Sequence, residues 1–204
     1  MTPVAESVEG DGRVRCSWAD FSGSRWAADD SVLYRNYHDT EWGRPLRGSR
    51  ELFERMTLEA FQSGLSWLII LRKRENFRRA FKRFEVAKVA RFTERDVERL
   101  MDDVGIVRNR AKIDATIANA RAVADLDVDL GELLWSFAPP AKPRPDDFTQ
   151  VPAVTPESKA MAKELKRRGF KFVGPTTAYA LMQATGMVDD HLASCWVPAV
   201  RRDA

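Results

Sequence analysis

Residues 155–169, TPESKAMAKELKRRG, contain the signals for both ends of one α-helix. Thr155 is a favoured N-cap residue, Pro156 suits the first helical position, and Glu157 complements the positive end of the helix dipole. Gly169 follows a basic last turn and is suited to end the helix, because glycine adopts the left-handed conformation found there. The stretch therefore predicts a helix that begins after Thr155 and stops before Gly169.

Helical spacing of apolar residues also dominates the rest of the chain. Residues three or four positions apart lie on one helical face. Three such sets are Leu52, Phe53, Met56, Ala60 and Phe61; Val97, Leu100, Met101 and Val104; and Ile113, Ile117, Ala120, Val123 and Ala124. No stretch alternates with period two, and segment 138–156, with six prolines, predicts a surface loop. We therefore expect an all-α fold.

The composition is typical of a soluble globular protein. The chain has 204 residues, of which 44% are hydrophobic and 31% charged. Residues 1–15 are polar and predict a disordered leader, which leaves 16–204 as one domain. No apolar run approaches the ~20 residues that span a bilayer, and the N-terminus lacks the apolar core of a signal peptide. These features argue against a membrane protein and favour a cytoplasmic one.

Basic residues are clustered although the net charge is only +3. Residues 72–83, RKRENFRRAFKR, contain seven basic residues and one acid. Clustered cations can neutralise phosphates and give sequence-independent affinity for nucleic acid. For either cluster alone, a solvated helix face is the more common explanation. The second cluster comprises Lys163, Lys166, Arg167, Arg168 and Lys171.

The chain contains two cysteines and two histidines, which together would make one zinc site. His191 and Cys195 are four positions apart, so on a helix they would share one face. With Cys16 and His38 they supply two thiolates and two imidazoles, a full tetrahedral zinc shell. Such a zinc would be structural and would join the N-terminal segment to a C-terminal helix. The alternative is two buried free thiols and two ordinary hydrogen-bonded histidines.

Eight ordered motifs extend from about Cys16 to Cys195. They are RCSW at 15–18, YRNYHDTEWG at 34–43, LEAFQSGLSW at 58–67, KREN at 73–76, VGIVRNRAK at 104–112, WSF at 135–137, KRRGFKFVG at 166–174 and Asp190-His191. Together they resemble the bacterial 3-methyladenine DNA glycosylase I family. The resemblance implies a helix-hairpin-helix DNA glycosylase fold. It also implies zinc ligands at Cys16, His38, His191 and Cys195, the set already reached from residue chemistry.

The resemblance implies two DNA-binding loops. The first is a hairpin at residues 172–178, FVGPTTA, beside the second basic cluster. Backbone N–H groups and a helix N-terminus there would bind a phosphate. The second is the turn before Trp67, where Leu65 would fill the gap left by a flipped base, unless it is an ordinary core leucine. The expected DNA contacts are Gly64, Leu65, Lys171, Gly174, Thr176 and Thr177.

The resemblance also implies a pocket for a base rotated out of the double helix. An aromatic wall would stack on a methylated adenine, and Glu59 would accept hydrogen bonds from it and recognise its positive charge. Core packing is the common alternative for each aromatic residue. Glu59 lies among apolar residues, where a buried acid needs a partner or a function. The aromatic positions match Trp18, Tyr34, Tyr37 and Trp67.

The implied activity is hydrolysis of the N-glycosidic bond of 3-methyladenine in alkylated double-stranded DNA. It would leave an abasic site without a lyase step, since no lysine occupies a position that suggests Schiff-base chemistry. Glu59 is the expected catalytic residue, and Asp189 is a secondary candidate because the wider superfamily has an aspartate there. Capping of a helix at His191 is the favoured alternative for Asp189 and Asp190. We expect a monomer with a structural zinc and no nucleotide cofactor.

The sequence alone is also compatible with two other classes of protein. A DNA-binding module would use the hairpin without excising a base, although a carboxylate among aromatic residues argues against it. A zinc-stabilised interaction protein would have no nucleic-acid role. DNA affinity that is absent or independent of salt would favour this last class.

Overall fold

The computed structural model describes residues 11–19 and 27–199, and all regular elements in these ranges are helical. The absence of strands within the described ranges confirms the expected all-α fold. None of the helices found there is long and apolar enough to cross a membrane. In chain order the elements are η1 (Ser17–Ala19), α1 (Ala28–Thr40), α2 (Ser49–Gln62), α3 (Trp67–Ala80), η2 (Lys82–Phe84), α4 (Val86–Val89), α5 (Glu94–Asp102), α6 (Arg110–Ala124), α7 (Leu130–Trp135), η3 (Phe148–Gln150), α8 (Pro156–Arg167) and α9 (Pro175–Ala184).

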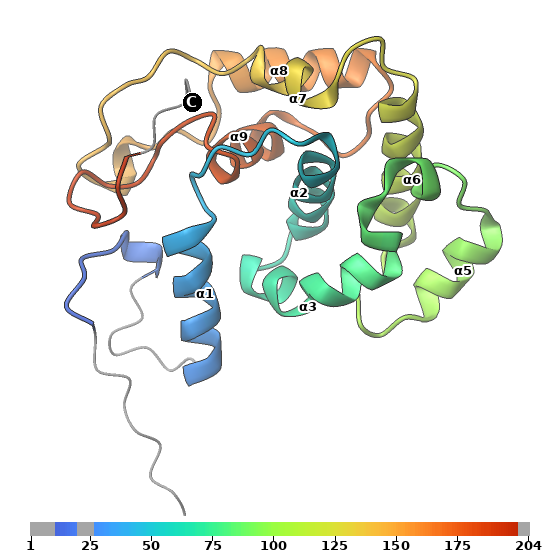
Figure 1. The fold of residues 1–204 in the computed structure, drawn as a ribbon, viewed down its shortest axis with the longest axis horizontal. Coiled ribbons are helices and arrows are strands. Elements are labelled where there is room, and N and C mark those ends of the chain that lie inside the picture. Colours follow the sequence, from blue (N-terminus) through green and yellow to red (C-terminus); the bar gives the residue numbers. More distant parts are fainter. Residues whose placement is uncertain (1–10, 20–26, 200–204) are drawn as a thin grey trace, which may run out of the picture.

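Helix α2 lies at the centre of the fold and is buried on nearly all sides. It packs against α3, α6, α7 and α9, and Figure 1 shows it surrounded by them. Leu52, Phe53 and Phe61 have no exposed surface. Because such a helix has no broad solvent face, its polar residues Arg55 and Glu59 are also enclosed in the protein.

Local signals account for the ends of α8. Thr155 and Ser158 bond to each other's backbone N–H groups in a capping box, and Pro156 is the first helical residue. The helix ends at Arg167, and Gly169 has the left-handed conformation with φ +89°. Both predicted ends are therefore confirmed. The predicted loop at residues 138–156 contains only the short helix η3 before α8 begins at its last residue, Pro156.

One predicted helical face is too long. Val97 and Leu100 are buried on α5 as expected, but the helix ends at Asp102. Val104 lies beyond that end with 73% of its surface exposed. Its apolar character continued the spacing of the helix by coincidence, because periodicity alone does not mark where a helix stops.

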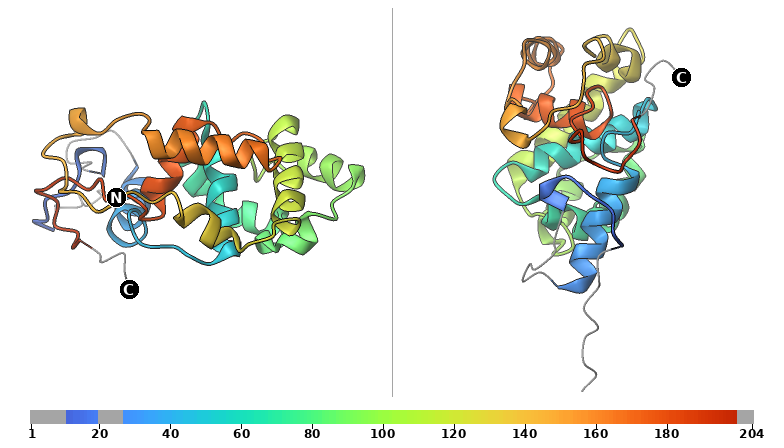
Figure 2. Two further views of the ribbon diagram at one scale, coloured as in Figure 1. Left: turned by 90° about the horizontal axis from the view of Figure 1, so that it is seen from above. Right: turned by 90° about the vertical axis from the view of Figure 1, so that its left-hand side faces the viewer.

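The two ends of the described chain lie side by side. Figures 1 and 2 show residues 11–19 against the segment that follows α9, next to α1. Trp196 N donates to Val14 O at 2.8 Å, and Arg15 Nη2 donates to Asp39 Oδ2 at 2.8 Å. Of the predicted leader, residues 1–10 lie outside the described residues, while residues 11–15 make these contacts.

The helix expected at residues 191–195 does not form. Residues 186–199 contain no helix, and residues 191–195 make a tight turn in which Cys195 N donates to Leu192 O. Leu192 N donates to the sulfur of Cys16 at 3.4 Å. Ala193 N likewise donates to Pro145 O at 2.8 Å, so N–H groups of this segment bond to parts of the chain that are distant in sequence. Spacing along the sequence cannot reveal such contacts.

Candidate functional site

A cavity of about 380 Å³ lies where η1, α1, α2, α3, α9 and the loop with η3 meet. Its volume is in the range of small-molecule sites. Its wall is rich in aromatic side chains, which are Trp18, Tyr34, Tyr37, Trp42, Trp67, Phe148 and Tyr179. The polar side chains that line it are Glu59, Gln62, Thr176 and Gln183.

The aromatic rings of the cavity wall pack against one another at an angle. The ring of Trp18 contacts Tyr34 and Trp42 with centroids 5.5 and 5.0 Å apart and near-perpendicular planes. Tyr37 and Trp67 are 5.3 Å apart and tilted by 45°. Such contacts hold rings in place without covering both faces of each. The cavity is therefore suited to a flat, aromatic ligand.

Glu59 is the acidic group of this cavity. Only 5% of the residue is exposed, and burial raises its pKa to about 7, partly offset by the charge of Arg55 one helical turn earlier. Arg55 directs its hydrogen bonds elsewhere, to Tyr37 Oη at 2.9 Å and Glu41 Oε2 at 3.2 Å. A positively charged ligand in the cavity would favour the ionised form of Glu59.

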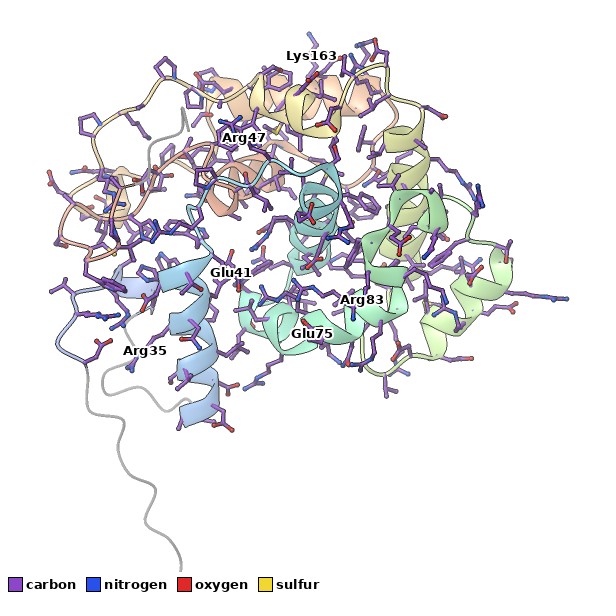
Figure 3. All side chains as sticks on the ribbon, viewed as in Figure 1. Arg35, Glu41, Arg47, Glu75, Arg83 and Lys163 are labelled. Atoms are coloured by element: carbon purple, nitrogen blue, oxygen red, sulfur yellow. The ribbon has the colours of Figure 1, made fainter. Side chains whose placement is uncertain are left out.

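Glu41 fixes the position of Arg55. Figure 3 shows Glu41 at the C-terminal end of α1, on the side that faces α3. It accepts two hydrogen bonds from Arg74, at 2.6 and 2.9 Å, in addition to the one from Arg55. A bidentate arginine–carboxylate pair has a defined geometry, so Arg55 is held beside Glu59 as a nearby charge.

Asp190 supports the opposite wall of the cavity. It is 1% exposed, and its Oδ2 accepts from Tyr179 Oη at 2.6 Å and from Gln183 Nε2 at 3.0 Å. A carboxylate only accepts hydrogen bonds, so it draws the NH2 group of Gln183 toward itself. The expectation that Asp190 caps a helix is wrong, because no helix follows it and its carboxylate binds side chains of α9.

Asp189 lies outside the cavity lining. Its Oδ2 accepts from Arg144 Nε at 2.9 Å, and its Oδ1 accepts from His191 N at 3.3 Å. The second bond spans two residues and stabilises a turn in place of the expected helix start. The structure therefore does not bring Asp189 together with Glu59.

Both predicted DNA-binding loops border the cavity. Gly64 is exposed with φ +81°, and Leu65, partly exposed, closes a turn by donating from its N–H to Gln62 O at 2.7 Å. Gln62 before this turn and Trp67 after it both line the cavity. In the hairpin, Lys171, Gly174 and Thr176 are exposed and Thr177 partly so; Gly174 is the N-cap of α9, and Thr176 reaches the cavity.

Part of the charge in the basic segment 72–83 is neutralised within the protein, since three of its seven basic residues pair with acids of other segments. Arg72 pairs with Asp30 of α1, and Arg78 pairs with Glu54 of α2. In the second cluster, Arg167 and Arg168 both bond to Glu164, whereas Lys163 points away from the molecule in Figure 3. Part of segment 72–83 is therefore engaged in contacts between helices, whereas Lys82 and Arg83 are exposed. The second cluster lies next to the hairpin.

The two cysteines and two histidines form one buried cluster. Their ligand atoms all lie within 4.8 Å of one another. Sγ of Cys16 is 3.5 Å from His191 Nδ1, and Sγ of Cys195 is 3.6 Å from both His191 Nδ1 and His38 Nε2. Tetrahedral zinc with usual bond lengths separates its sulfur and nitrogen ligands by about 3.5 Å. The cluster therefore has the dimensions of a four-coordinate metal site.

Hydrogen bonds turn the metal-binding nitrogen of each histidine toward the cysteines. His38 Nδ1 donates to Asp39 Oδ1 at 2.7 Å, which leaves Nε2 as the lone-pair atom. His191 Nε2 donates to Trp42 O at 3.1 Å, which leaves Nδ1. These are the two nitrogen atoms that face sulfur, and such outer bonds commonly orient metal ligands. The donor set and its surroundings thus fit a bound metal ion.

The cluster and the cavity share a wall. The ring of Trp18 contacts His38 with centroids 5.0 Å apart, and the ring of Trp42 contacts His191 at 4.7 Å. Both tryptophans line the cavity. The position of two cavity-lining rings therefore depends on the position of two histidines.

Comparison with known proteins places the chain in a family. The methyladenine glycosylase family profile matches residues 26–198. The chain belongs to the methyladenine glycosylase family.

Relatives of this glycosylase cover most of its length. DNA-3-methyladenine glycosylase 1 of Escherichia coli is 46% identical over 175 residues, which cover 83% of this chain and 93% of that protein. A crystal structure of 3-methyladenine DNA glycosylase I is 44% identical, with a TM-score of 0.82 and coverage of 90% of this chain and 98% of that one. A crystal structure of a 3-methyladenine DNA glycosylase I variant in complex with 3-methyladenine is 34% identical, with a TM-score of 0.79 and coverage of 87% and 96%.

The glycosylase brings all five predicted pocket residues to one cavity, including Glu59 from α2 and Trp67 from α3. Sequence reasoning missed nine further residues of its wall, five of which are Phe148, Val151, Pro152, Ala153 and Ala180. Of the other four, Trp42 and Gln62 lie inside motifs that were already singled out for their neighbours. Tyr179 and Gln183 follow Thr176 by three and seven positions, so one face of α9 lines the cavity, and this spacing was the available signal.

Proposed function

We propose that this protein hydrolyses the N-glycosidic bond of 3-methyladenine in alkylated double-stranded DNA, releasing the free base and leaving an abasic site. The observation that carries the proposal is a buried carboxyl group, Glu59, in a cavity with aromatic walls. The names of its relatives, and the relative crystallised with 3-methyladenine, support the same substrate.

Base recognition follows from charge and ring stacking. An adenine methylated at N3 within DNA is cationic, and its ring is attracted to the faces of tryptophan and tyrosine. The carboxylate of Glu59 accepts hydrogen bonds from the base edge and favours the cation over an undamaged, neutral adenine. Where a bound base displaces water from the cavity, this charge difference is stronger than in bulk water.

The reaction needs no nucleophile from the protein. The bond between the sugar C1′ and the base nitrogen breaks, and its electron pair stays on the base, which leaves as a neutral molecule. Water adds to C1′ and loses a proton to solvent, which completes the hydrolysis. Positive charge moves from the base to the sugar in the transition state, where Glu59 and the DNA phosphates stabilise it. Asp189 is bound by Arg144 away from the cavity, so we assign the role of the charge-stabilising carboxylate to Glu59.

The two loops beside the cavity would hold the DNA. The N-terminus of α9, with Gly174, Thr176 and Thr177, offers N–H groups to a phosphate, and Lys171 adds charge. Leu65 would occupy the gap left by the flipped nucleotide. One chain supplies both loops and the named cavity residues, so we expect the enzyme to act as a monomer.

We propose zinc as the ion held by Cys16, His38, His191 and Cys195. Two thiolates, two imidazoles and separations near 3.5 Å suit zinc in a closed structural site. Zinc would supply no reaction chemistry there, since four protein ligands fill a tetrahedral shell. It would secure the N- and C-terminal segments and the two tryptophan rings that rest on the histidines.

Product analysis tests the activity directly. The purified protein is incubated with methylated duplex DNA, and the released bases are identified by chromatography and mass spectrometry. We expect free 3-methyladenine from the wild type and much less from Glu59→Gln and Trp67→Ala. Trp135→Ala is the matched control, because Trp135 lies outside the cavity and bonds to Leu46 O. Undiminished release by both cavity variants would refute the assignment of the site, and tight binding without release would favour a DNA-binding module.

A further inference from the structure

Helix α6 carries two buried polar side chains that leave the helix to bind loops. Lys112 is 8% exposed and Asn119 is 2% exposed. They are seven positions apart, so they lie on one face, two turns and about 10 Å along the axis. Neither residue lines the cavity. Each bonds to the backbone of a different loop.

Lys112 holds the turn that contains Leu65. Its Nζ donates to Phe61 O at 2.9 Å and to Ser63 O at 2.7 Å. These carbonyl groups lie at the C-terminal end of α2, where the helix has no partners of its own for them. A cation at this end also complements the helix dipole. Lys112 thus fixes the point at which α2 stops and the turn to Gly64 and Leu65 begins.

Asn119 holds the hairpin between α8 and α9. Its Nδ2 donates to Lys171 O at 3.0 Å, and Lys171 N donates to its Oδ1 at 2.7 Å. One amide side chain therefore satisfies both backbone groups of Lys171. The next residue, Phe172, has positive φ and is 47% exposed, so its side chain does not anchor the hairpin. Phe170 and Val173 are buried on either side, and Asn119 fixes the backbone between these two anchors.

Helix α6 is itself firmly placed. Asn109 caps its first turn by accepting from Lys112 N at 3.1 Å, and the helix packs against α2, α4 and α5. Ile113 and Ala120 have no exposed surface. A rigid element thus connects two loops that lie far apart in the sequence, and Figure 1 shows α6 extending from the level of α7 and α8 toward α5.

We propose that α6 sets the separation between the Leu65 turn and the hairpin, with Lys112 and Asn119 as its positioning residues. The inference rests on the proposed function, in which one loop fills the gap in the duplex while the other binds a phosphate. A DNA duplex presents these two features at a defined separation. Loops already held at the matching distance do not have to be ordered when DNA binds, which favours affinity.

The test separates DNA binding from base binding. Lys112→Met and Asn119→Ala remove the loop contacts, and Thr116→Val is the matched control. Thr116 is 3% exposed on the same helix, but its hydroxyl bonds to Lys112 O within the helix. Affinity for a duplex with a stable abasic-site analogue is measured by fluorescence anisotropy. Affinity for free 3-methyladenine is measured by tryptophan fluorescence.

We expect each positioning variant to weaken binding to the abasic duplex about tenfold, as for the loss of a buried hydrogen bond. Binding of free 3-methyladenine should stay within about twofold of wild type, because the cavity contacts are unchanged. The affinity of the double variant for the abasic duplex should fall by less than the product of the two single fold-losses. The reason is that the separation between the two loops is already lost when either bond is removed. Thr116→Val should match wild type in both assays.

Other outcomes overturn the inference. If duplex binding by both variants equals that of Thr116→Val, α6 does not position the loops. If free-base and duplex binding fall together, Lys112 and Asn119 act only through general stability. If Lys112→Met does not fold, Asn119→Ala decides the question, with hydrogen exchange at the Lys171 amide reporting the lost bond. A wild type that binds free base but no damaged duplex refutes the proposed function itself.

Discussion

Replacing Glu59 by glutamine is expected to make the protein more stable and less active. Burial raises the pKa of Glu59 from 4.5 to about 7. Each pKa unit corresponds to about 1.4 kcal/mol. Ionising this group in the folded protein therefore costs about 3 kcal/mol more than in the unfolded chain, and an uncharged glutamine avoids that cost.

The direction of the pH dependence follows from the same shift. Between pH 4.5 and about 7 the folded protein keeps a proton that the unfolded chain has released. The free energy of unfolding of the wild type should therefore decrease as pH rises through this window, and the loss is complete above about pH 7. The difference between Glu59→Gln and wild type should be smallest near pH 4.5 and increase by about 3 kcal/mol by pH 8.

Urea denaturation followed by circular dichroism at pH 5, 6, 7 and 8 measures this difference. The control is Glu98→Gln, which changes an exposed carboxylate on α5 and should shift stability by less than about 0.5 kcal/mol at each pH. The rate of base release should depend on pH in the opposite direction to stability. The wild-type rate should rise through about pH 7 as Glu59 ionises, and the Glu59→Gln rate should be low at every pH. A stability difference between Glu59→Gln and wild type that does not change with pH would refute the reasoning.

Three further predictions concern the loops and the metal cluster. Leu65→Ala should reduce excision from methylated duplex at least tenfold while free 3-methyladenine binds as in wild type; equal losses in both assays would place Leu65 in the cavity instead. Elemental analysis should find about one zinc per chain. Cys195→Ser should lose the metal and have a lower Tm. Removal of the metal without a change in Tm would contradict the zinc assignment. Gly186→Ala should lower the free energy of unfolding, measured in urea, by more than about 2 kcal/mol. Gly186 has φ +73°, and an added Cβ would lie 2.7 Å from the backbone of Arg44 and Pro45. A loss below about 0.5 kcal/mol would show that this backbone can move.

Local signals and motif order account for what the sequence predicted. The ends of α8 depend on Thr155, Pro156 and Gly169, which act within one or two turns of chain, so they can be identified without a structure. Glu59 was recognisable because an acid within an apolar helical pattern is unusual. The family motifs then indicated the aromatic residues that meet around it.

Contacts between distant segments account for the features that the sequence did not predict. Residues 191–195 were expected to be helical. They form a turn instead, in which Leu192 N donates to the sulfur of Cys16. The acids that neutralise Arg72 and Arg78 come from α1 and α2. The sequence of the basic segment alone therefore predicts more unpaired positive charge than the structure has. The role of Asp190 likewise depends on α9.

The adjacency of Cys16 and Cys195 has a mechanical consequence. A metal ion bound to both would close nearly the whole chain into a ring, which in the chain-entropy description of cross-links stabilises a fold of this length by about 5 kcal/mol. Tension applied to either terminus would reach this closure before it reached any helix from α1 to α9. A proteolytic machine that unfolds proteins by pulling on an end would then be resisted by metal–ligand bonds, so the lifetime of the protein under load would depend on the supply of metal.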